Sequence, residues 1–152
     1  MTVLFSYKFY TITVTNIQRR ISFTVSTIQD IDKVWVAEEI IVFPKVISNE
    51  GGGYDAFTGI YTVPHNGVYV FACHLASFDS GFIAKIVVDG VPKVGIPVAF
   101  DNTSTSSRGA AGNTVVVSLQ QGDQVWVAHV IGGALWTHAY FPYSTFSGFL
   151  LG

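Results

Sequence analysis

The stretch Val46–Phe71, VISNEGGGYDAFTGIYTVPHNGVYVF, decides the fold class of this 152-residue chain. Short apolar runs are separated in it by Asn-Glu-Gly-Gly-Gly and by Pro-His-Asn-Gly, residues that favour turns and positive φ angles. This spacing is typical of antiparallel β-structure, and no helical periodicity interrupts it.

The same pattern continues to both sides of this stretch and predicts ten strands. Asp89-Gly90, between Val88 and Val91, is the residue pair that suits a type I′ hairpin turn. We also expect Asp123, after Gly122, to accept hydrogen bonds from turn amides. Ten short strands in one core favour an all-β sandwich or jelly roll. The expected strands are Ile21–Thr27, Ile40–Phe43, Val46–Ser48, Gly59–Val63, Gly67–Ala76, Phe82–Val88, Gly95–Phe100, Thr114–Leu119, Gln124–Ile131 and Thr145–Leu150.

The composition is apolar and poor in charge. Hydrophobic residues make up 49% of the chain and charged residues 12%, with 8 Lys+Arg against 10 Asp+Glu. This balance excludes a basic nucleic-acid binder and a disordered chain, and no apolar run approaches the ~18 residues of a membrane helix. Val68–Ala76 and Val125–Ile131 are apolar at almost every position, which predicts strands covered on both faces. We therefore expect one face to meet a neighbouring subunit.

Four segments resemble the globular C1q domain family, the relatives of tumour necrosis factor. They are ISFTVS, the stretch quoted above, LQQGDQVWV and STFSGFLL, in the order and spacing of that family. The resemblance implies a ten-stranded antiparallel jelly roll over residues 21–152 that assembles as a homotrimer. It also implies a secreted protein that recognises other molecules without catalysis.

The first twenty residues fall outside this resemblance. They contain neither the apolar run of a signal peptide nor a Gly-X-Y collagen repeat, so we expect residues 1–20 to be an N-terminal arm or extension. Thr11–Thr15 alternates strictly, which is compatible with an edge strand or an extended arm.

Calcium is the cofactor that the resemblance raises, because some family members bind it through two aspartates about eight residues apart. Asp101 matches the first of them, whereas the second falls at or next to Arg108. A guanidinium in place of a carboxylate works against calcium, although Asn102 and the hydroxyls of 103–107 offer oxygens. A solvated loop is the favoured interpretation.

The histidines and the single cysteine do not form a catalytic or metal-binding pattern. Cys73 excludes an internal disulfide and is expected to be a buried thiol; it cannot pair with His74, since adjacent strand residues lie on opposite faces. We expect His74 and His129 to be buried and hydrogen-bonded. The alternative is that they face a trimer axis and respond to pH. No nucleophile elbow or phosphate loop is present, so an enzyme is not predicted.

The segment Gly132–Thr145, GGALWTHAYFPYST, is unusually aromatic for a surface connection. Packing against its own sandwich or an adjacent subunit is one interpretation, and contact with a ligand is the other. Aromatic rings with polar edges stack on sugar rings and bond their hydroxyls. The predicted ligand contacts are Trp136, His138, Tyr140 and Tyr143, with Asn102 and Arg108 as polar partners and Asp101 linked to a metal.

These observations lead to a lectin-like pattern-recognition protein that binds carbohydrate on microbial surfaces in innate immunity. The alternative is a cytokine-like trimeric ligand for a protein receptor. A structural matrix protein would need a more acidic surface. Further loop candidates are 30–33 with Trp35, and 78–80.

Overall fold

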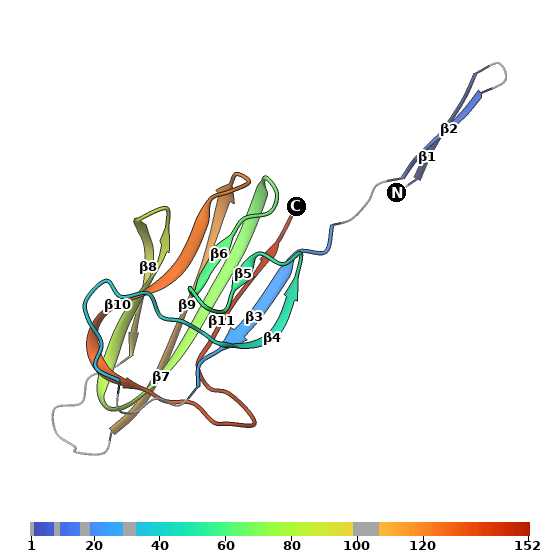
Figure 1. Cartoon of the computed structure of the whole chain (residues 1–152). Helices are drawn as coiled ribbons and strands as arrows, with labels where there is room; N and C mark the ends of the chain where they lie inside the picture. The colour runs from blue at the N-terminus through green and yellow to red at the C-terminus, as the bar shows by residue number, and fades with distance from the viewer. Residues whose placement is uncertain (1, 8–9, 16–18, 29–32, 99–106) are drawn as a thin grey trace.

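The computed structural model describes residues 2–7, 10–15, 19–28, 33–98 and 107–152, and all of its regular elements are strands (Figure 1). None of the described segments is a helix that could cross a membrane. The strands are β1 (Thr2–Tyr7), β2 (Tyr10–Thr15), β3 (Ser22–Ser26), β4 (Lys45–Glu50), β5 (Tyr54–Asp55), β6 (Ile60–Thr62), β7 (Gly67–Val88), β8 (Val91–Val98), β9 (Ser107–Leu119), β10 (Gln124–Leu135) and β11 (Thr145–Leu150).

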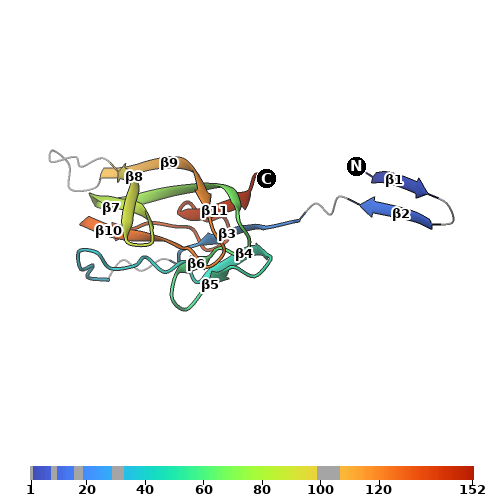
Figure 2. The same ribbon diagram turned by 90° about the horizontal axis from the view of Figure 1, so that it is seen from above.

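The long strand β7 belongs to both layers of a sandwich. Its first half pairs with β11 and β9, and its second half pairs with β10 and β8. The two layers therefore run β4-β3-β11-β7-β9 and β5-β6-β10-β7-β8. Figure 2 shows β9 and β5 at opposite sides of the sandwich. Since β7 counts once in each layer, the predicted ten-stranded antiparallel jelly roll is confirmed.

The core lies between these layers and is rich in aromatic rings. Alternate residues of β7 point inward, and Tyr69, Phe71 and Cys73 are fully buried. Phe23 from one layer stacks on Tyr61 from the other, with 4.5 Å between ring centroids. Each such ring buries about 150–250 Å² and dominates the local packing energy. Aromatic residues of the stretch Val46–Phe71 thus pack against Phe23 to join the two sheets.

Tyr54 adds a polar anchor at the edge of this core. Its hydroxyl donates to the Phe43 carbonyl and accepts from the Phe43 amide, each at 3.0 Å. Burial raises the pKa of Tyr54 to about 12, because the phenolate would lose its hydration. The segment before β4 is held to the sandwich through this contact.

Two turn predictions are confirmed. Asp89 and Gly90 have φ angles of 47° and 80° and join β7 to β8, as a type I′ hairpin requires. Asp123 accepts a hydrogen bond from the Gln120 amide at 2.8 Å through Oδ2.

Several predicted boundaries are wrong. Gly67–Ala76 and Phe82–Val88 form one strand rather than two, because β10 pairs with β7 across the junction. Ile40–Phe43 is not a strand and makes only a bridge from Ile40 to Ala128; its apolar pattern arises because Ile41 and Phe43 enter the core. The predicted strand Thr114–Leu119 begins earlier, at Ser107, where small residues pair with β7 but give no hydrophobic signal. Phe100, the expected end of another strand, lies outside the described residues.

The N-terminal strands β1 and β2 form a separate two-stranded sheet. The alternating segment Thr11–Thr15 belongs to β2 and pairs with β1 in antiparallel register.

Candidate functional site

The aromatic connection from β10 to β11 is fastened at its base by Ser144. This buried hydroxyl accepts from the Ala76 amide at 3.0 Å and donates to the Trp136 carbonyl at 2.9 Å. The Trp136 amide in turn donates to the Ala76 carbonyl at 2.8 Å. The two ends of the loop are therefore joined to each other and to β7.

Two further hydrogen bonds shape the rest of the loop. Lys45 Nζ, on β4, donates to the Ala139 carbonyl at 2.9 Å. The Tyr143 amide donates to Thr137 Oγ1 at 3.1 Å, and Thr137 is itself buried. Because these contacts involve main-chain groups, they define the path of the loop and so the positions of its rings.

The rings of the loop form one connected cluster. Trp136 and Tyr143 lie with centroids 4.7 Å apart, and His138 stacks on Phe141 at 3.7 Å with an interplanar angle of 9°. Tyr143 is 6.1 Å from both His138 and Phe141. Tyr140 is 5.9 Å from His138, and 88% of its surface is exposed. The cluster thus presents aromatic surface to solvent while its base is buried.

A shallow hollow of about 400 Å³ lies beside Trp136 and Tyr143. Arg108, Gly109 and Ala110 of β9 also line it, together with Ala76. The Arg108 guanidinium carbon is 4.8 Å from the centroid of the Trp136 ring, within the range of a cation–π contact. The small residues of β9 leave space that longer side chains would fill.

The structure brings together most of the predicted ligand contacts. Trp136, Tyr143 and Arg108 line one hollow, and His138 joins them through Tyr143. Tyr140 lies beside His138, as does Phe141, a residue that the prediction left out. Asp101 and Asn102 lie outside the described residues. Within the described part of the chain, no group of three His, Cys, Asp or Glu residues is arranged to hold a metal ion.

The two strand histidines behave differently. His129 is buried as predicted, with Nδ1 3.0 Å from the Val36 carbonyl and Nε2 3.2 Å from the Gly132 carbonyl. The prediction for His74 is wrong: it is exposed, and its ring lies against Gly112 of β9. Cys73 is fully buried, and this burial raises the pKa of its thiol, so it is an inert core residue.

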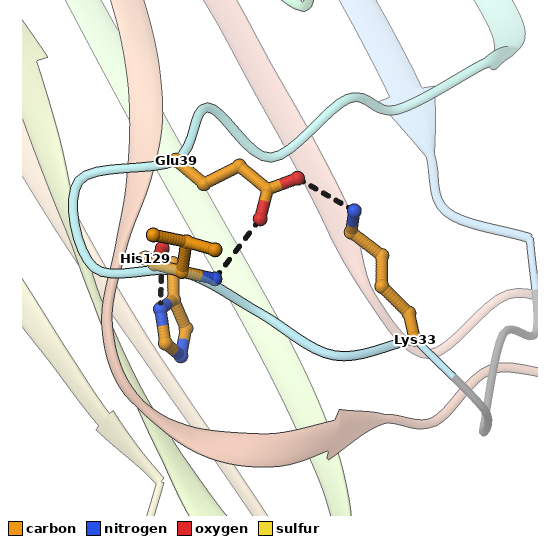
Figure 3. A network of polar contacts seen from close by, with 4 residues as sticks. Lys33, Glu39 and His129 are labelled. Carbon is orange, nitrogen blue, oxygen red and sulfur yellow. Dashed lines mark hydrogen bonds and ion pairs between the residues drawn. The ribbon is translucent and has the colours of Figure 1, made fainter.

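A second, smaller hollow of about 220 Å³ lies under the connection from β3 to β4. Lys33, Trp35 and Glu39 line it, and Figure 3 shows the Lys33 ammonium directed at the Glu39 carboxylate. This carboxylate accepts from Lys33 Nζ at 2.6 Å and from the Val36 amide at 3.1 Å. These two bonds lower the pKa of Glu39, so its carboxylate stays ionised. Trp35 stacks on His129 with centroids 5.7 Å apart. This cluster includes two of the further loop candidates, Lys33 and Trp35.

The chain is similar to a known family and to several known proteins. The family model described as C1q domain matches residues 22–151. Caprin-2 of Danio rerio is 33% identical over 114 residues, Multimerin-1 of Mus musculus 34% over 112 residues, and human Complement C1q and tumor necrosis factor-related protein 9A 32% over 114 residues. These matches cover 75%, 73% and 73% of this chain but 12%, 9% and 33% of those proteins. The chain therefore spans a third or less of the length of these relatives.

Solved structures of low sequence identity share the fold. The globular domain of zebrafish complement 1qA superposes with a TM-score of 0.69 at 21% identity, over 87% of this chain and 98% of that one. Eiger TNF from S. frugiperda gives a TM-score of 0.65 at 15% identity, over 89% and 94% of the two chains.

Proposed function

This chain belongs to the C1q domain family, and on that premise we propose that it is a secreted, non-catalytic recognition module that binds carbohydrate on microbial surfaces. Members of the family are generally recognition or ligand modules rather than enzymes. The sugar-binding site is the aromatic cluster of the β10–β11 loop with the hollow beside it.

The observation that supports this proposal is the rigid placement of exposed rings beside an open hollow. Trp136 and Tyr143 offer flat apolar faces for the C–H face of a pyranose, and the hollow leaves about 400 Å³ for the rest of the sugar. The Arg108 guanidinium, which lies against the Trp136 ring, adds a positive charge to the lining of the hollow. Because the loop base is held by Ser144, little conformational entropy is lost when a ligand binds.

Domains of the C1q and tumour necrosis factor families form trimers, and we expect the same of this chain. Three equivalent sites per particle raise the avidity for a repetitive surface by about 10²–10⁴ when they bind at the same time. A shallow site of low intrinsic affinity is then sufficient for recognition.

A glycan array tests the proposal with the full chain, Trp136→Ala and a matched control. Phe57→Ala serves as the control, since Phe57 is an exposed ring on the β5–β6 turn and lines no part of the hollow. We expect selective glycan binding that is lost in Trp136→Ala and kept in Phe57→Ala. Parallel arrays with calcium and with chelator decide whether Asp101 takes part through a metal. A blank array in both buffers contradicts the lectin proposal.

Binding to a protein receptor is the second candidate function. Val34 and Val36, beside the Trp35 hollow, are 86% and 67% exposed, and exposed apolar patches are typical of protein interfaces. The two functions use different surfaces. We would then expect the full chain and Trp136→Ala to bind the receptor and Val34→Asp to lose it. This result supports the receptor candidate instead.

A further inference from the structure

In the described part of the chain, β1 and β2 pair with each other and with no strand of the sandwich. Its register sets Val3 opposite Val14, Phe5 opposite Ile12 and Tyr7 opposite Tyr10. The intervening pairs are Thr2–Thr15, Leu4–Thr13 and Ser6–Thr11. Successive residues of a strand belong to opposite faces, so the register assigns the apolar pairs to one face and the mostly hydroxylated pairs to the other.

A hairpin of this kind is incomplete by itself. An isolated two-stranded sheet is at best marginally stable in water, because it has no second layer to cover an apolar face. Each strand also has one edge whose main-chain groups pair with no other strand of the described chain. The ribbon therefore needs a partner that supplies both apolar surface and main-chain hydrogen bonds.

We propose that this partner is the same hairpin from a second copy of the chain. Residues 2–15 contain a single charged residue, Lys8, so the ribbon offers almost no charge with which to select a different, charged partner. An identical ribbon supplies an equally apolar face and an equally open edge. Assembly of the heads also brings further copies of the ribbon onto one particle, which raises their effective concentration. The inference depends on assembly and not on the carbohydrate site.

Disulfide trapping in the full chain tests this contact. Ile12→Cys places a thiol among the apolar pairs, and Thr13→Cys places one at the neighbouring position among the hydroxylated pairs. Cys73 does not compete, since it is fully buried in the sandwich. Under the same mild oxidant, we expect Ile12→Cys to form covalent dimers at least about tenfold faster than Thr13→Cys, because contact raises the local thiol concentration.

Non-reducing gels measure the dimer, and thermal unfolding of each variant confirms that the head is intact. If the rate of Ile12→Cys trapping is unchanged on dilution, the contact is between copies within one particle. If the rate falls on dilution, the contact is between different particles. Both results support the proposal. Equal, slow cross-linking of the two variants overturns it. An Ile12→Ser variant, which cannot cross-link, gives the background of the assay.

Discussion

Ser144 is the residue on which the shape of the candidate site depends most directly. Its hydroxyl links the Ala76 amide to the Trp136 carbonyl in a buried position. We predict that Ser144→Ala lowers the free energy of unfolding by about 1–3 kcal/mol, since both main-chain groups lose a partner away from water. Urea denaturation measures this loss, and glycan binding should weaken in parallel because the loop ends are no longer joined.

Ser147→Ala is the matched control for this prediction. Ser147 is on β11, which begins directly after Ser144, and is half-buried, but its hydroxyl makes only a 3.5 Å contact with the Ala72 carbonyl. We expect a change within about 0.5 kcal/mol. Equal losses in the two variants would contradict the role given to Ser144.

Single residues show what the sequence could and could not predict. Cys73 was expected to be buried, and it is; adjacent strand residues lie on opposite faces, so His74 had to point outward. The expectation of a buried His74 followed the apolar character of the strand, which predicts cover on both faces, whereas the sandwich of one chain covers only the inner face. The role of Ser144 could not be predicted, because its partners Ala76 and Trp136 are brought to it only by the fold.

At the scale of elements, turn chemistry was more informative than hydrophobic runs. Asp89-Gly90 fixed its hairpin correctly because few other residues adopt positive φ at both turn positions. The apolar run Ile40–Phe43 was misleading, since burial in the core and membership of a sheet give the same composition. The length of β7 could not be predicted from the sequence either, because strand continuity depends on partners such as β10 that are distant in the sequence.

Two glycines with positive φ, one in a turn and one in a strand, allow a prediction about the sandwich. Gly90 has φ 80° and open space where a Cβ would lie, so Gly90→Ala carries only the cost of a left-handed backbone, about 1–2 kcal/mol. Gly132, in β10, has φ 117°, and a Cβ there would lie 2.5 Å from the Gly81 carbonyl oxygen of β7. We predict a clearly larger loss of stability for Gly132→Ala, because the backbones of β10 and β7 must move apart.

Thermal or urea unfolding of the two variants side by side measures the difference. Gly90→Ala controls for the loss of glycine itself, since both positions have positive φ. Equal destabilisation would show that the approach of β10 to β7 at Gly132 is not tight.

At the scale of the whole molecule, an apolar row crosses the outer face of one sheet. Val70 pairs with Phe149 on one side and with Val116 on the other, while its neighbours Tyr69 and Phe71 enter the core. Val116 is 58% exposed and Phe149 46% exposed. The sequence had predicted that β7 would be covered on both faces, and this row is where the sandwich alone leaves it uncovered.

We predict that a charge in this row prevents assembly without unfolding the head. The full chain should scatter light as at least three times its 16.5 kDa mass, and Val116→Lys as a smaller particle, because burying an unpaired ammonium in an interface is costly. Val91→Lys is the matched control, an exposed valine of β8 in the other sheet, and should keep the assembled mass. Circular dichroism confirms that each variant is folded.

If carbohydrate recognition depends on three sites acting together, Val116→Lys should also lose about 10²–10⁴ in apparent affinity for a glycan-coated surface while retaining its affinity for a soluble monovalent glycan. A full chain that already scatters as 16.5 kDa would refute assembly through this row and, with it, the avidity on which a weak site depends.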